Sequence, residues 1–76
     1  MASLMENIID VLEKEEAEYR TLISLSQEKT PIIIKGDLDG LAKITDREQE
    51  VVGRIQKLEK TRLQIMEDIA NVTNRK

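Results

Sequence analysis

Residues 30–40 read Thr-Pro-Ile-Ile-Ile-Lys-Gly-Asp-Leu-Asp-Gly, and this stretch decides the fold. It holds the only proline and two of the three glycines in the 76-residue chain. Gly36 suits the left-handed residue that ends a helix, and Asp37 or Asp39 suits the N-cap of the next one. The sequence therefore predicts that the chain reverses here, through a turn at about 36–40.

The segment before the turn predicts one long helix, from about residue 3 to about residue 35. Ser3 suits its N-cap, and Glu6 follows at the capping-box spacing. Pro31 removes one backbone hydrogen bond, so the helix either kinks there or restarts with Thr30 as a new cap. Apolar residues continue at intervals of three and four through this point, which favours a kinked but nearly continuous helix. The three isoleucines after the proline have the composition of a strand, but no partner strand is evident in the sequence.

The segment after the turn predicts a second helix, from about residue 38 to about residue 74. Residues 45–48 have a capping-box pattern that would allow a break, and Gly53 costs about 1 kcal/mol relative to alanine. The three-and-four apolar spacing runs through both features, so we expect one helix. Together the two segments predict an all-α fold, a single long antiparallel helical hairpin over residues 1–76.

The apolar stripes of the two predicted helices align in one register, in which the numbers of facing residues add up to about 77. The side chains predicted to pack between the helices, or against a partner, are Ile8, Leu12, Tyr19, Leu22, Ile33, Ile44, Val51, Ile55, Leu58, Ile65 and Ile69. The register also places the charged interruptions of each stripe opposite charges of the other sign. The predicted interhelix ion pairs are Glu15 with Arg62 and Lys29 with Glu48. Chance alignment is the alternative, because long charged helices often oppose unlike charges.

A lone hairpin leaves apolar side chains uncovered, because a two-helix layer buries only one side of each stripe. The side chains that widen the stripes into a second seam are Ile9, Ile23, Ile34, Val52, Leu63 and Met66. We therefore expect partner helices to cover them, from a second copy or from a bound protein. The simplest closed arrangement is a twofold dimer that forms a four-helix bundle. Two chains that exchange helices would satisfy the same stripes.

Composition excludes most functions that need reactive side chains. The chain has no histidine and no cysteine, which removes the imidazole base, the thiol nucleophile and the thiolate zinc site. Its net charge of −3, without a basic run, argues against nucleic-acid binding. The longest apolar run has three residues, and the start of the chain lacks the features of a signal peptide, so we expect no membrane insertion and a cytoplasmic location. We therefore expect that the chain is not an enzyme and that it holds no cofactor and no metal ion.

Two clusters resemble metal sites only in part. If Gly40 took the sixth position of an EF-hand loop, Lys35 would take the first, where an ammonium group cannot bind calcium. The acidic residues between 13 and 18 lack the histidines that accompany carboxylates in di-metal helical bundles. The simpler interpretation is that the aspartates near the turn act as caps and that most of the acidic cluster is solvated.

A further pattern covers nearly the whole chain. It comprises Leu12-Glu13-Lys14-Glu15 and Tyr19, then Gly36-Asp37-Leu38 at the turn, then Leu41, Thr45, Glu48, Glu50, Ile55, Leu58-Glu59 and Arg62. These residues resemble the FlgN family of flagellar export chaperones. Asp39-Gly40 departs from the stronger helix formers expected there. The chain also ends short of the C-terminal helical region to which the family's client binding is assigned, so we expect a fragment or a short member and carry over no client-binding residue.

The resemblance implies a cytoplasmic helical chaperone of flagellar type III secretion. Such proteins hold hook-associated (hook-filament junction) proteins unassembled and deliver them to the export apparatus. An acidic hairpin with a spare apolar seam is compatible with this role, because it can cover an amphipathic helix of a client. The expected partners are therefore proteins, with a homodimer favoured. The alternative function is a generic helical oligomerisation or adaptor module without chaperone activity.

Overall fold

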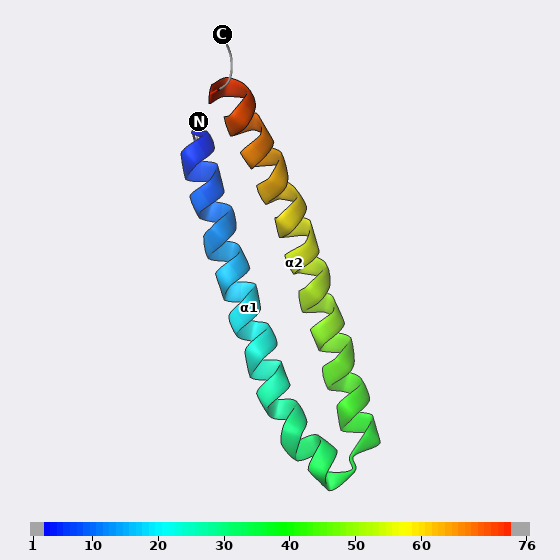
Figure 1. Cartoon of the computed structure of the whole chain (residues 1–76). Helices are drawn as coiled ribbons and strands as arrows, with labels where there is room; N and C mark the ends of the chain where they lie inside the picture. Colours follow the sequence, from blue (N-terminus) through cyan, green and yellow to red (C-terminus); the bar gives the residue numbers. More distant parts are fainter. Residues whose placement is uncertain (1–2, 74–76) are drawn as a thin grey trace.

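The computed structural model describes residues 3–73, which form two long helices, α1 (Leu4–Lys35) and α2 (Leu38–Thr73). The helices run antiparallel and side by side along their length (Figure 1). The resulting hairpin measures 62 × 18 × 14 Å. The predicted all-α antiparallel hairpin is therefore confirmed. The predicted end of the second helix, at about residue 74, lies outside the described residues.

Helix α1 begins at a side-chain cap and continues through its proline. The Ser3 hydroxyl accepts a hydrogen bond from the backbone N–H of Glu6 at 3.1 Å. Pro31 lies inside α1, and no new helix starts at Thr30. Because proline has no backbone N–H, the carbonyl of Gln27 lacks its usual helical donor. One missing bond is tolerated within a helix of 32 residues.

The end of α1 is a left-handed glycine cap. Gly36 has φ 70° and ψ 26°, a conformation that costs residues with a Cβ about 1–2 kcal/mol. Its N–H donates to the carbonyl of Ile33 at 3.0 Å, and the N–H of Asp37 donates to that of Ile32 at 3.2 Å. These two bonds form a Schellman motif, which satisfies carbonyls that the helix end would otherwise leave free.

Asp37 caps the start of α2. Its Oδ1 accepts from the backbone N–H of Gly40 at 2.9 Å, and a Cβ on Gly40 would come within 2.5 Å of Asp37 Oδ2. Asp39 and Gly40 already belong to the first turn of α2, so the reversal takes only Gly36 and Asp37. The sequence placed the turn at about 36–40 and the start of the second helix at about 38, and α2 begins at Leu38 because one aspartate caps it directly after the glycine ends α1.

Helix α2 is continuous through both of its predicted weak points. The Thr45 hydroxyl donates to the carbonyl of Leu41 at 2.9 Å instead of capping a new helix. Gly53 lies in the middle of the helix, with nothing within 4 Å of the place a Cβ would take. The capping-box pattern at 45–48 therefore does not break α2.

The two helices meet along a seam whose members are spaced alternately by three and four residues, the seven-residue repeat of a coiled coil. All of them are buried or half-buried. The seam consists of Leu4, Ile8, Val11, Glu15, Glu18, Leu22, Leu25, Lys29 and Ile32 from α1 and Leu41, Ile44, Glu48, Val51, Ile55, Leu58, Arg62, Ile65 and Ile69 from α2. Its best-packed part is the core cluster of Leu25, Ile44, Val51 and Ile55.

Three of the side chains predicted to pack between the helices or against a partner lie outside the seam. Leu12 is 47% exposed, Tyr19 43% and Ile33 56%. The seam takes the preceding residues instead, including Val11 and Ile32. The physical reason is that α1 carries two apolar stripes one residue apart, and a one-residue step rotates a side chain by about 100° around the helix axis.

Candidate functional site

Two ionic layers cross the seam at the positions that the sequence analysis paired. In the first, Arg62 Nε lies 3.2 Å from Glu15 Oε1, and Glu15 is only 6% exposed. Although this distance is within ion-pair range, neither atom has a hydrogen-bond partner in suitable geometry. The contact is therefore a close ion pair without an aligned hydrogen bond.

The second ionic layer lies nearer the turn and is better formed. Lys29 Nζ donates to Glu48 Oε1 at 2.9 Å, and the Ser26 hydroxyl approaches Glu48 Oε2 at 3.5 Å. Both charged side chains are partly shielded from water by the helices. Sliding one helix along the other would separate both pairs, so the two layers together favour a single register.

Most large apolar side chains that remain exposed gather on one side of the hairpin. Nine of these side chains belong to residues that come directly after a seam residue in the sequence. We call this set the apolar face: Met5, Ile9, Leu12, Tyr19, Ile23 and Ile33 from α1, and Val52, Leu63 and Met66 from α2. On two antiparallel helices, the same one-residue step away from the seam points to the same side of the layer.

A contact between the helices supports this assignment. The Tyr19 hydroxyl donates to Glu59 Oε1 at 3.2 Å, and both residues directly follow seam residues. The bond raises the pKa of Tyr19 above its ordinary value of 10.0, because ionisation would replace the phenol donor with a phenolate beside a carboxylate. The single tyrosine of the chain is thus tethered on the apolar face.

The opposite side of the hairpin is polar. It consists of residues that directly precede seam residues: Asn7, Asp10, Lys14, Thr21, Ser24, Glu28, Lys43, Arg47, Glu50, Arg54, Lys57, Thr61, Gln64 and Asp68, together with Ala17, Pro31 and Gly40. Across this polar face Arg47 Nη1 lies 3.8 Å from Glu28 Oε2. Arg54 Nε also donates to the seam residue Glu18 at 2.8 Å. The hairpin is therefore a two-helix layer with one apolar and one polar face.

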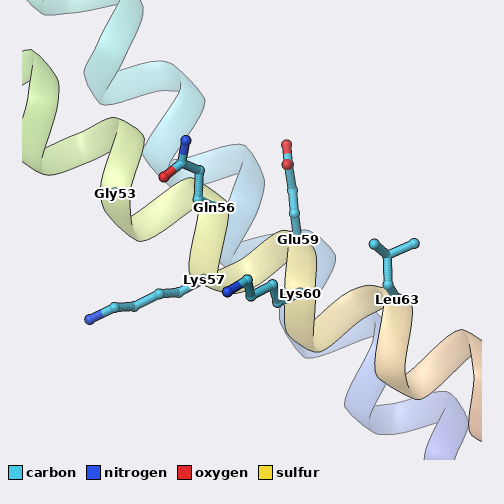
Figure 2. Close-up of a pocket in the computed structure, with 6 residues that line it drawn as sticks. All are labelled: Gly53, Gln56, Lys57, Glu59, Lys60 and Leu63. Carbon is cyan, nitrogen blue, oxygen red and sulfur yellow. The ribbon is translucent and has the colours of Figure 1, made fainter.

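One surface depression lies on α2 alone. It encloses about 500 Å³ and is lined by Gly53, Gln56, Lys57, Glu59, Lys60 and Leu63. Figure 2 shows Gln56, Glu59 and Leu63 projecting from the same side of the helix, while Lys57 points away from them. Because one helix supplies every lining residue, the depression is open and has no opposing wall to enclose a small molecule.

Two kinds of feature are absent from the part of the chain that the structure describes. Among residues 3–73, no three or more aspartate or glutamate side chains come together in a way that would hold a metal ion. In the same part of the chain, no helix is long and apolar enough to span a membrane.

The predicted packing residues divide between the seam and the apolar face. Those in the seam are Ile8, Leu22, Ile44, Val51, Ile55, Leu58, Ile65 and Ile69, whereas Leu12, Tyr19 and Ile33 lie on the apolar face. The sequence analysis missed the Glu18–Arg54 and Tyr19–Glu59 contacts. A strict seven-residue repeat, which needs a seam position between Glu15 and Leu22, would have placed Glu18 in the seam.

The hairpin is thus an all-helical layer with one exposed apolar face. The family model described as FlgN protein matches residues 1–76, the whole chain. The chain belongs to the FlgN family, a family of flagellar export chaperones that act on protein partners. The resemblance seen in the sequence is thereby confirmed. Searches among curated proteins and among solved structures gave no significant match.

Proposed function

We propose that this chain is a cytoplasmic chaperone of flagellar type III export that binds hook-associated (hook-filament junction) proteins through the apolar face. The observation that carries the proposal is the gathering of nine exposed apolar side chains on one side of the hairpin. Family membership supports the flagellar export role, and the apolar face offers a surface on which a client can bind. The proposed role requires binding and release, followed by transfer to the export apparatus, and no catalytic step.

The physical basis of the proposed chaperoning is helix covering. An amphipathic helix of the client would lie on the apolar face, across both α1 and α2, and pack there as a third helix. Removing its apolar stripe from water is favourable by about 25 cal/mol of free energy for each Å² of apolar surface buried. While covered, this stripe is unavailable for assembly with other subunits.

Neighbouring residues on opposite faces allow a matched test. Ile23→Ser with Leu63→Ser removes two exposed aliphatic side chains from the apolar face, and Ser24→Ala with Gln64→Ser alters the polar face beside them. We expect the first double variant to bind a hook-associated protein at least tenfold more weakly in a calorimetric titration. The second should bind like the unchanged chain. Equal affinities for all three proteins, or no binding by the unchanged chain, would refute the proposal.

A second copy is the alternative occupant of the same face. Two hairpins that press their apolar faces together would form a four-helix bundle, and we propose this homodimer for the chain without its client. If the chain is instead a generic oligomerisation or adaptor module, the dimer should form without any affinity for hook-associated proteins. Sedimentation equilibrium, followed by titration with a hook-associated protein, separates these two functions.

A further inference from the structure

Negative charge is concentrated on the apolar face and along its edges. We count as edge residues those that lie two positions after a seam residue and do not directly precede the next one. Here the carboxylates are Glu6, Glu13, Glu16, Asp46, Glu59 and Glu67. Within residues 3–73 only two cations, Arg20 and Lys60, share this side, whereas the polar face carries five cations and four carboxylates. The acidic character of the chain therefore lies on the side that exposes apolar side chains.

Several of these carboxylates lie close to the apolar side chains. Figure 2 shows Glu59 projecting beside Leu63 on the same side of α2. Glu16 continues the three-and-four spacing of the apolar face between Leu12 and Tyr19. A helix that docks on this face would thus bring its own flanking residues near carboxylates on both α1 and α2.

We infer that the preferred occupant of the apolar face is an amphipathic helix of another protein whose apolar stripe is flanked by lysine or arginine. This inference rests on the proposed function, because it specifies the chemistry of the client helix. Basic side chains would extend their aliphatic stems over the apolar face and place their charges beside the carboxylates. A second copy would instead bring six carboxylates against the same six, which weakens self-association relative to client binding.

Three synthetic helical peptides of equal length test the charge preference. They share one leucine stripe and differ in its flanking residues, which are lysine, glutamine or glutamate. In calorimetric titrations of the whole chain at low salt, we expect the lysine peptide to bind about tenfold more tightly than the glutamine peptide, and the glutamate peptide to bind weakest. High salt should narrow the difference, because it screens exposed charges. Equal affinities at low salt would overturn the inference.

Two charge reversals show whether the preference belongs to the apolar face. Glu16 pairs with Arg20 at 2.6 Å, and Asp10 pairs with Lys14 at 2.9 Å on the polar face. Glu16→Lys and Asp10→Lys therefore each remove one exposed pair within α1 and change the net charge equally. We expect Glu16→Lys to lower the affinity for the lysine peptide about fivefold and Asp10→Lys to leave this affinity nearly unchanged. Circular dichroism checks that both variants remain helical, and equal losses would overturn the inference.

Sedimentation velocity identifies which occupant is preferred. At saturating lysine peptide we expect one chain with one peptide, whether or not the free chain is a dimer. A dimer that stays intact while the peptide binds would overturn the inference, because the peptide would then lie elsewhere.

If a hook-associated protein binds equally well to the unchanged chain and to Glu16→Lys, the inference fails and the proposed function stands. If the lysine peptide binds the apolar face but no hook-associated protein does, the proposed function fails instead.

Discussion

The seam has the same residue spacing near the turn and near the open end, but it contains different kinds of side chain in these two halves. Near the turn, Leu25 and three aliphatic side chains of α2 form the core cluster, beside a hydrogen-bonded ionic layer. Toward the open end, the seam contains the misaligned pair of Glu15 with Arg62, and Ile8 and Ile69 are only half-buried. Most tightly buried aliphatic contacts between the helices are therefore made near the turn.

The exposed apolar side chains are spread over both halves. Five of the nine side chains of the apolar face lie toward the open end, namely Met5, Ile9, Leu12, Leu63 and Met66. Ile34 and Leu38, near the turn, are also strongly exposed, so both halves present apolar surface. The two halves therefore differ in how the helices are held together, because most of the tightly buried aliphatic contacts lie near the turn, and not in the apolar surface that they offer to a partner.

The largest expected effect separates a seam leucine from an apolar-face leucine. Leu25 is 2% exposed within the core cluster, whereas Leu12 is 47% exposed. We expect Leu25→Ala to lower the free energy of unfolding by about 3 kcal/mol, because it leaves a cavity, and Leu12→Ala to lower it by less than about 1 kcal/mol. Urea unfolding followed by circular dichroism measures both. Equal destabilisation would remove the distinction between seam and apolar face.

A smaller effect tests the ionic layer of the open half. Arg62→Met leaves Glu15 buried without its cation, and because the Arg62 side chain is 36% exposed we expect a loss of only about 1–2 kcal/mol. The double variant Glu15→Met with Arg62→Met should recover this stability or exceed it. Arg47→Met removes only an exposed pair and serves as the control, with a loss below about 0.5 kcal/mol. A double variant as unstable as Arg62→Met alone would contradict the account.

The smallest effect concerns Tyr19 and its partner across the apolar face. Because the chain has one tyrosine and no tryptophan, absorbance near 295 nm reports its ionisation alone. We expect a midpoint above 10.0, and Glu59→Gln should lower it by removing the neighbouring negative charge. A raised pKa in the folded state means that this contribution to stability is present below about pH 10 and is lost as pH rises through the folded value. Identical midpoints for both proteins would show that the Tyr19–Glu59 contact is absent in solution.

The turn and the helices were predictable from local chemistry. Gly36 and Asp37 each have one strong conformational use, and together they end one helix and cap the next. The seam of α2 was also predictable, because its second stripe is interrupted by polar side chains such as Gln56 and Glu59 and does not compete with the first. The choice between Asp37 and Asp39 as the cap of α2 was not, since either residue has the chemistry of a cap.

The inward side of α1 was not predictable from periodicity. Val11 and Leu12 are adjacent and both apolar, as are Ile32 and Ile33, so either member of each pair fits a three-and-four spacing. The contact of Glu18 with Arg54 was missed for the same reason, because it links a seam position to the polar face and needs the rotation of α1 to be known. Only the placement of α2 against α1 shows which stripe turns inward.

Because two stripes of α1 could face α2, the ionic layers matter for the rotation of α1 about its own axis. If α1 were rotated by about 100° about its axis, Leu12, Tyr19 and Ile33 would enter the contact and bury a similar amount of apolar surface. Glu16 would then take the place of Glu15 opposite Arg62, but Thr30 would take the place of Lys29 and leave Glu48 without its cation. The Lys29–Glu48 pair therefore favours the observed rotation of α1, which leaves the second apolar stripe exposed.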